Sequence, residues 1–376
     1  MCRLLDMDTL NRLCLLVVLL GATSNFSAQN IYKLDFDLDY IKSISSYPSA
    51  GDLIAVNDSI ALVNFGWALI CKTNFKSGKF LDTLDNALVY EKIQSKLKST
   101  EVYKEAEFFS VKDIGEITTC NGYYIQFQRI IRLDFDRYVC EVRLQTKNFG
   151  VLSVILQLNQ DLDIEEIKVL ENTFDFGVSY VSMNGYYEMN DELFIWSGLT
   201  DTSVYDKNTP CYYSRFKFNG DYYKFSGFLE GVKHGKKNVY TAQFHSFFYN
   251  NEKLCITNGW EIFCFGDSLR TCEYNLDLGL SADEVYTNIW PIDAGEYIAV
   301  RKNIDDIGSA IGDCTIELLD EKFKVFDKLV QFNIISTYLK SFDFHNGVAY
   351  LYLSSSDKKE MILRTFKVED YREKKE

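Results

Sequence analysis

Short stretches in which apolar and polar residues alternate recur along the chain, and tight-turn residues separate them. The stretch "FDFHNGVAYLYLSSS" (342–356) is typical, because an apolar run leads into Asn346-Gly347 and an alternating run follows it. A two-residue type I′ turn needs positive φ at both positions, which Asn tolerates and Gly adopts without steric cost. Strand side chains alternate with a period of two, so each such stretch predicts an antiparallel β-hairpin.

The same pattern predicts six hairpins at uneven spacing. Their turns lie at residues 57–58, 121–122, 190–191, 250–251, 294–295 and 346–347. Each of the first five units has room for two further strands, such as "ALICKTNF" and "FLDTL" in the first. A repeated unit of four antiparallel strands is the blade of a β-propeller, so we predict an all-β, six-bladed β-propeller. A pair of β-sandwiches is the alternative, since such hairpins occur in every antiparallel fold.

The last unit contains three strands, "YLKSFDF", "VAYLYLS" and "MILRTFKV", before the charged tail. The missing fourth strand is available near the N-terminus, in "IYKLDFDLDYIKSI". We therefore predict that a strand within residues 30–45 pairs with the strand at Met361–Val368 and closes the ring. Closure would remove the exposed edges that an open sheet leaves.

We read residues 25–376 as one propeller domain, because no Pro/Gly/Ser-rich linker interrupts them and the whole chain has three prolines. The predicted blades span about 46–84, 108–158, 174–230, 240–280, 284–333 and 337–369. Two segments between blades are predicted as helices. "LDNALVYEKIQSKLKS" (84–99) follows helical apolar spacing, and "DLDIEEIKVLENTF" from Asp161 follows it less closely.

The N-terminus predicts export. "LCLLVVLL" (13–20) is too short to span a membrane and suits a signal peptide, with Ala22 and Ser24 small where a signal peptidase reads. We assign residues 1–24 to this peptide, with Met7 as an alternative start. The mature protein is expected in the periplasm or outside the cell, without a transmembrane segment.

Charge and cysteine content limit which binding partners, disulfides and metal sites are expected. A net charge of −14 disfavours nucleic acid, which is bound through basic surfaces. Eight cysteines remain after cleavage, an even number that permits disulfides in an exported chain. The sequence contains no CxxC motif, so we do not expect a zinc site. A two-residue turn at Asn258-Gly259 would place Cys255 opposite Ile262 and not Cys264, so we expect the cysteines to be small buried apolar residues.

No nucleophile elbow, Walker A loop, dinucleotide fingerprint or HExxH motif is present, and we expect no metal and no cofactor. Propellers carry function on loops. The longest connections between second and third strands are 198–210 and 302–313, and both are expected beside the central channel. Their candidate ligand-binding residues are Asp201, Tyr205, Asp305 and Asp306, an aromatic surface with carboxylate acceptors.

The segments "DLIAVNDSIALVNF" and "WPIDAGEYIAVRKN" resemble the blades of secreted bacterial six-bladed propellers of the TolB-like and NHL-like kind. The glycine-rich segment often found after the first blade of such proteins is absent after Leu84. The resemblance implies binding more readily than catalysis. We therefore expect an exported, non-enzymatic monomer that binds a peptide, protein or glycan through one face of the ring. The alternative is a carboxylate-based hydrolase or lyase, with or without a metal, at the channel mouth.

Overall fold

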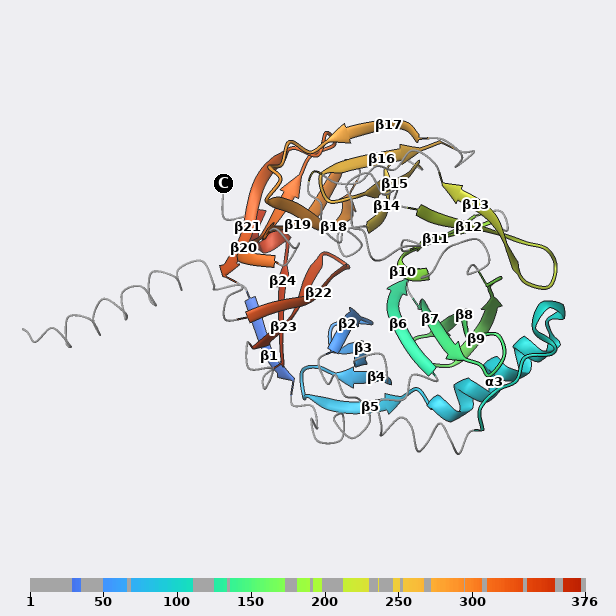
Figure 1. The fold of residues 1–376 in the computed structure, drawn as a ribbon. Helices are drawn as coiled ribbons and strands as arrows, with labels where there is room; N and C mark the ends of the chain where they lie inside the picture. The colour runs from blue at the N-terminus through green and yellow to red at the C-terminus, as the bar shows by residue number, and fades with distance from the viewer. Residues whose placement is uncertain are drawn as a thin grey trace, which may run out of the picture.

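The computed structural model describes most of the strands and one long helix. The described residues are 29–34, 50–65, 69–110, 125–133, 136–172, 181–189, 192–197, 212–229, 236, 246–250, 253–266, 272–293, 295–305, 310–333, 337–355 and 361–372. They form six four-stranded antiparallel sheets arranged around a ring, as predicted (Figure 1).

The first three blades follow one another along the chain. Blade 1 contains β2 (Ala50–Ala55), β3 (Ile60–Phe65), β4 (Leu69–Asn74) and β5 (Lys79–Thr83). Blade 2 contains β6 (Ile125–Arg132), β7 (Arg137–Gln145), β8 (Val151–Asn159) and β9 (Ile164–Val169). Blade 3 contains β10 (Val181–Met189), β11 (Glu192–Ser197), β12 (Tyr212–Phe218) and β13 (Tyr223–Leu229).

The last three blades complete the ring. Blade 4 contains β14 (Ser246–Asn250), β15 (Lys253–Thr257), β16 (Glu261–Phe265) and β17 (Cys272–Asp277). Blade 5 contains β18 (Glu284–Asp293), β19 (Glu296–Ile304), β20 (Ala310–Leu319) and β21 (Val325–Asn333). Blade 6 contains β22 (Thr337–His345), β23 (Val348–Ser355), β24 (Met361–Lys367) and β1 (Gln29–Leu34).

The N-terminal strand closes the ring, as predicted. β1 pairs antiparallel with β24 over its whole length, from Gln29 opposite Phe366 to Leu34 opposite Met361. The short helix α5 (Glu369–Arg372) follows β24. First and last strands of the chain therefore share one sheet, so blade 6 is held together by residues from both ends of the sequence.

The hydrophobic core lies between neighbouring blades. One cluster joins blades 1 and 6 through residues such as Val63, Phe65, Tyr352 and Leu363. Another joins blades 5 and 6, with Val300, Ile316 and Leu351 among its members. Because both faces of each sheet are covered by neighbouring blades, inner strands such as β3 and β7 are buried along nearly their whole length, whereas the outermost strands β5 and β17 are mostly exposed.

The turn prediction holds at Asn346-Gly347 and fails in blade 2. Asn346 and Gly347 have φ of 50° and 74°, as a type I′ turn requires. In blade 2 the first hairpin turn lies between Arg132 and Arg137, so the predicted turn at 121–122 precedes β6 and does not join the first two strands. Residues 111–124 themselves lie outside the described part of the chain.

One helix prediction is confirmed and the other is wrong. α3 (Asn86–Ser99) forms where the sequence predicted it, and the 3-10 turn η1 (Glu101–Tyr103) follows. The segment after Asp161 forms β9 instead, because Ile164, Ile167 and Val169 pack into the core of blade 2 while β9 completes its sheet. Sheet pairing and burial outweigh a weak helical pattern.

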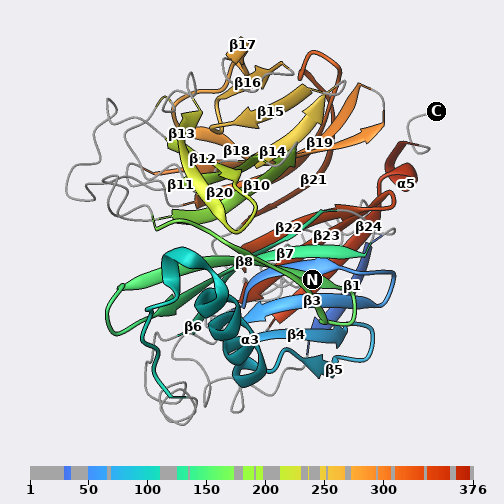
Figure 2. The same ribbon diagram turned by 90° about the vertical axis from the view of Figure 1, so that its right-hand side faces the viewer.

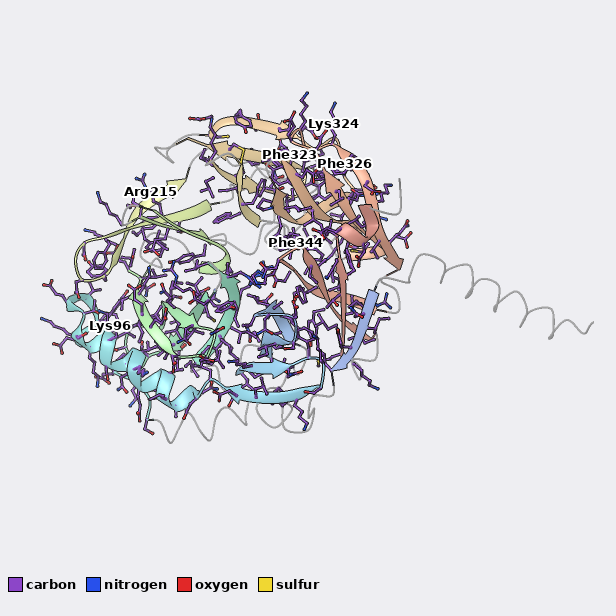
Figure 3. The ribbon with its side chains drawn as sticks, turned by 180° about the vertical axis from the view of Figure 1, so that it is seen from behind. Lys96, Arg215, Phe323, Lys324, Phe326 and Phe344 are labelled. Carbon is purple, nitrogen blue, oxygen red and sulfur yellow. A yellow bond between two sulfur atoms is a disulfide. The ribbon has the colours of Figure 1, made fainter. Side chains whose placement is uncertain are left out.

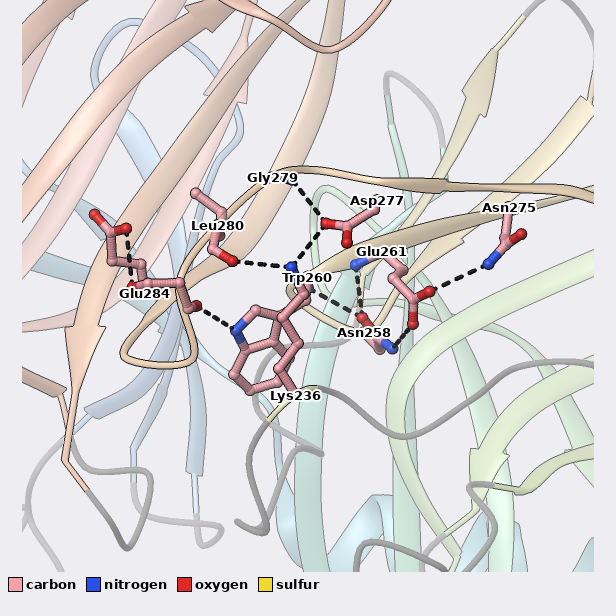
Figure 4. A network of polar contacts seen from close by, with 10 residues as sticks. Lys236, Asn258, Trp260, Glu261, Asn275, Asp277, Gly279, Leu280 and Glu284 are labelled. Carbon is pink, nitrogen blue, oxygen red and sulfur yellow. Dashed lines mark hydrogen bonds and ion pairs between the residues drawn. The ribbon is translucent and has the colours of Figure 1, made fainter.

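The predicted pairing of Cys255 is also wrong. Three residues (258–260) separate β15 from β16, and the pairing places Thr257 opposite Ile262 and Cys255 opposite Cys264. The two cysteines form a disulfide with Cα atoms 4.3 Å apart. Asn258 holds this longer turn by accepting hydrogen bonds from the backbone N–H groups of Trp260 and Glu261, as Figure 4 shows. Cys71, Cys140 and Cys314 are buried thiols that form no disulfide.

Among the described residues, the helices are too short or too polar to cross a membrane. The N-terminal residues 1–28, which carry the predicted signal peptide, lie outside the described part of the chain.

Candidate functional site

A groove lies on the outer rim of the ring, between α3 and the outermost strand of blade 2. Its volume is about 690 Å³, and β9 runs along its floor. α3 lies outside blades 1 and 2 and in front of their strands in the view turned by 90° (Figures 1 and 2). The start of β13 and the end of β12 close the groove on the side of blade 3.

The helix wall exists because α3 has two faces of different chemistry. Val89, Tyr90, Ile93 and Leu97 are buried against the core between blades 1 and 2. Burying such a side chain contributes about 1.5–3 kcal/mol relative to leaving it exposed. The helix begins after Asp85, whose carboxylate accepts hydrogen bonds from the backbone N–H groups of Ala87 and Leu88 in the first turn. The opposite face is therefore free to line the groove.

The helix wall carries Leu88, Glu91, Lys92, Ser95 and Lys96. Figure 3 labels Lys96 on this helix at the outer edge of the molecule. These positions follow helical spacing, so they form one continuous stripe. Leu88 is 48% exposed, which is high for a large apolar side chain beside a groove.

The blade 3 wall combines aromatic and acidic side chains. Phe218 at the end of β12 is 39% exposed, and its ring centroid lies 5.2 Å from that of Tyr223. Asp221 lies in the turn between them and accepts a hydrogen bond from the backbone N–H of Glu101. An apolar surface bordered by a few placed polar groups is typical of binding sites.

A charged cluster lies at the inner end of the groove. The Nζ atom of Lys168 lies 2.5 Å from both carboxylate oxygens of Glu188. Glu188 also accepts hydrogen bonds from the hydroxyl groups of Tyr186 (2.6 Å) and Tyr223 (2.8 Å). The Lys168 ammonium lies 5.7 Å from the ring centroid of Tyr223. The cluster thereby ties the outermost strand of blade 2 to the first and last strands of blade 3.

The cluster sets the protonation of its members. Burial opposes the charge on Glu188, but hydrogen bonds from Lys168, Tyr186 and Tyr223 outweigh it and lower the pKa of this carboxyl. Burial first, and then the Glu188 carboxylate, raise the pKa of Tyr186. Glu188 is therefore ionised and Tyr186 is a neutral hydrogen-bond donor at neutral pH, and both oxygens of the Glu188 carboxylate are paired.

The structure does not bring the sequence-predicted site residues together with this groove. Asp201, Tyr205 and Asp306 lie outside the described residues. Asp305 follows β19 in the connection to β20 and is half-buried in blade 5, whereas the groove is lined by α3, blade 2 and blade 3. The four residues stay a prediction for the channel mouth.

Sequence reasoning missed the cluster because it predicted a helix where β9 forms. Lys168 sits in "EIKVL", between apolar residues that alternate as in a buried strand. That alternation was the available signal, since a lysine inside it predicts a buried charge that needs a partner. The sequence could not identify Glu188 as that partner, because Glu188 lies on a different blade.

A second polar cluster lies where the innermost strands of blades 1, 2 and 6 meet. Arg132 on β6 donates hydrogen bonds to the Ala55 carbonyl and, at 2.7 Å, to the Asp343 carboxylate on β22. The same carboxylate accepts the backbone N–H of Ala55 at 2.8 Å. Among the described residues, Nε and Nη1 of Arg132 are buried without a hydrogen-bond partner, so this cluster joins three blades but leaves part of the guanidinium unsatisfied.

Comparisons with known proteins show no family for this chain. No family model matches the chain, and no curated protein matches it. A solved structure of YCF48 bound to D1 peptide is similar over 91% of this chain and 96% of that chain, with 6% sequence identity and a TM-score of 0.43. A likeness at this level identifies neither a family nor a ligand, so the resemblance to TolB-like and NHL-like propellers stays a prediction.

Proposed function

We propose that this chain is an exported, non-enzymatic propeller that binds a peptide or a segment of a protein in the groove between α3 and β9. The observation that carries the proposal is the groove itself, with exposed Leu88 and Phe218 on opposite walls and charged side chains between them. A volume of about 690 Å³ lies within the usual range of ligand pockets. Exposed apolar side chains beside a concave surface mark interaction sites.

The chemistry of the groove supports binding over catalysis. Both oxygens of Glu188 accept hydrogen bonds from Lys168, and each accepts one more from a tyrosine. A saturated network fixes the shape of a wall, whereas a general acid or base must exchange its proton with a substrate. The cluster therefore supports a rigid wall between blades 2 and 3.

Two features support export. The apolar segment 13–20 has the length of a signal-peptide core. The Cys255–Cys264 disulfide is of a kind that persists in oxidising compartments such as the periplasm or the extracellular space. Mass spectrometry of protein from its natural source should find a mature N-terminus near Thr23 to Gln29. An intact Met1 or Met7 would overturn export.

Binding in the groove is tested by selecting peptides from a random displayed library against the folded protein. Phe218→Ala should weaken selected peptides by about tenfold, because the residue supplies exposed aromatic area to the wall. Phe326→Ala is the matched control, since Phe326 is 50% exposed on blade 5. Melting temperature is measured for both variants.

The same peptides test the channel mouth. Tyr205→Ala and Asp305→Ala should leave affinity unchanged if the groove is the site. Loss of affinity in these two variants, with Phe218→Ala unaffected, would reject the groove and move the site to the connections that follow β11 and β19. The second of these is shorter than the predicted 302–313, because β19 extends to Ile304 and β20 begins at Ala310.

A further inference from the structure

The floor of the groove is an unpaired strand edge. β9 is the last strand of its sheet and pairs with β8 on one side. Within the described residues, the backbone of β9 makes no hydrogen bond to α3 or to blade 3. Edge strands present unpaired N–H and C=O groups, and proteins normally cover or pair them. Here α3, which contacts β9, and the turn of blade 3 flank this edge and line a groove together with it.

The same edge already accepts a neighbour just beyond the groove. Leu170 forms a parallel bridge with Tyr223, and the backbone N–H of Glu171 donates to the Tyr223 carbonyl at 2.9 Å. The backbone at this rim is therefore oriented for pairing from outside the sheet. An extended chain placed in the groove would continue that pairing along β9.

We propose that the groove binds an extended polypeptide segment by adding it to β9 as a fifth strand, and that the preferred segment alternates acidic and basic residues. This inference rests on the proposed function and specifies how it is carried out. Strand addition draws affinity from backbone hydrogen bonds and specificity from pockets for alternate side chains.

The two sides of an added strand would face different walls. Ile167 and Val169 pack with the core beneath α3, whereas Lys168 points to Glu188 and Tyr223 of blade 3. Side chains of an added strand alternate in the same way, one row toward the helix and one row toward blade 3. The charges of the two walls therefore determine a pattern with a period of two.

The helix wall favours acidic side chains. Lys92 and Lys96 are one helical turn apart in the groove, and within the described residues neither forms an ion pair. Like charges at this spacing repel one another, and a carboxylate placed between them would relieve that repulsion. Glu91 lies on the same wall and offsets one of the two charges.

The blade 3 side favours basic side chains. Glu165 accepts a hydrogen bond from the Gln157 side chain and Asp221 accepts one from the backbone N–H of Glu101, and Glu166 is 51% exposed with Lys168 at 3.4 Å. Phe218 and Tyr223 lie beside these carboxylates. An arginine in this row would pair with a carboxylate and stack on an aromatic ring.

The test compares three short peptides by fluorescence anisotropy with the full mature chain. One alternates glutamate and arginine, the second contains the same residues as an acidic block followed by a basic block, and the third is the alternating peptide with N-methyl groups on alternate backbone nitrogens. The alternating peptide should bind at least about tenfold more tightly than either of the others, because the block sequence mismatches the walls and N-methylation removes backbone donors.

Charge variants test the walls. The double variant Lys92→Glu with Lys96→Glu should weaken the alternating peptide by about fivefold to tenfold, since it replaces two attractions by repulsions. Lys322→Glu is the matched control, because Lys322 is exposed on blade 5 and changes the net charge in the same direction. The Lys322→Glu variant should bind the alternating peptide with the same affinity as the unmodified protein.

The outcomes separate this inference from the proposed function. Equal binding of the alternating and N-methylated peptides would reject strand addition, while sensitivity to Phe218→Ala would keep the groove as the site. Equal binding of the alternating and block peptides would reject the charge pattern. If no peptide binds and the library also yields no binder sensitive to Phe218→Ala, both the inference and the proposed function fail.

Discussion

At the scale of single residues, the Lys168–Glu188 pair is the most consequential contact of the groove. Lys168 is 5% exposed, and its ammonium depends on Glu188 for its close charge-assisted hydrogen bonds. Leaving one member of such a pair without its partner costs more than the pair itself contributes. The pair therefore affects both stability and the shape of the groove.

Glu188→Gln should lower the free energy of unfolding by about 1–3 kcal/mol, because it leaves the buried Lys168 ammonium without its counter-charge. Urea denaturation followed by tryptophan fluorescence measures the change. Glu166→Gln is the control, since its ion pair with Lys168 is longer and half in solvent, and its loss should cost at most about 1 kcal/mol. Equal losses in the two variants would contradict the role assigned to Glu188.

The lowered pKa of Glu188 predicts that the protein loses stability at acidic pH. The pKa of Glu188 is lower in the folded chain than its ordinary value of 4.5, so the unfolded chain binds its proton first as the pH falls. The stabilisation is therefore complete above pH 4.5 and is lost as the pH falls from there through the folded pKa. Unfolding free energies measured across this range should fall less steeply in Glu188→Gln than in the unmodified protein.

At the scale of elements, the outermost strands β1 and β9 differ in their surroundings at the rim of the ring. β1 is the outermost strand of blade 6 and covers the edge of β24. β9 is the outermost strand of blade 2, and its edge opens into the groove. β9 covers β8 in the same way, so the difference lies in what stands beside each strand: α3 and the turn of blade 3 flank β9 and form the groove with it.

Deleting Gln29–Leu34 should lower the melting temperature and reduce solubility. The deletion exposes the edge of β24 and removes Leu34, which is buried in the cluster between blades 1 and 6. Circular dichroism melts and light scattering measure the two effects. Removing residues 373–376 is the control, because these follow α5. A deletion variant as stable and soluble as the control would reject closure through β1.

At the scale of the whole molecule, the ring is held by contacts between innermost strands as well as by the apolar clusters. β2 lies beside both β22 and β6, and β6 lies beside β10. Arg132, Ala55 and Asp343 join three blades at one point, with Asp343 contributed by the last blade and Ala55 by the first. This contact reinforces the junction that β1 closes at the rim.

Asp343→Asn should destabilise the ring by about 1–3 kcal/mol, because the guanidinium of Arg132 then lacks its charged acceptor in a largely buried position. Chemical denaturation measures the loss. Asp136→Asn, at an exposed position in the β6–β7 turn, should change stability by less than about 0.5 kcal/mol. Indistinguishable midpoints for the two variants would show that the three-blade contact is dispensable.

The sequence alone determined the local geometry of this protein. Asn346-Gly347 carries the positive φ values of its turn in the residues themselves, and the period of two in "VAYLYLS" follows from strand geometry. The orphan strand near the N-terminus followed from counting strands in the last blade. The amphipathic spacing of residues 86–99 likewise predicted α3 before any contact was known.

Tertiary structure decided the contacts between distant parts of the chain. Cys255 faces Cys264 because the turn between β15 and β16 has three residues (258–260) where two were expected, and Trp260 in this turn is buried against Val285 and Ile304 of blade 5. The segment at 164–169 is a strand because blade 2 lacked a fourth one, and Lys168 meets Glu188 because blades 2 and 3 pack side by side. Local pattern specifies the period of an element, whereas its register and partners depend on which surfaces the closed ring brings together.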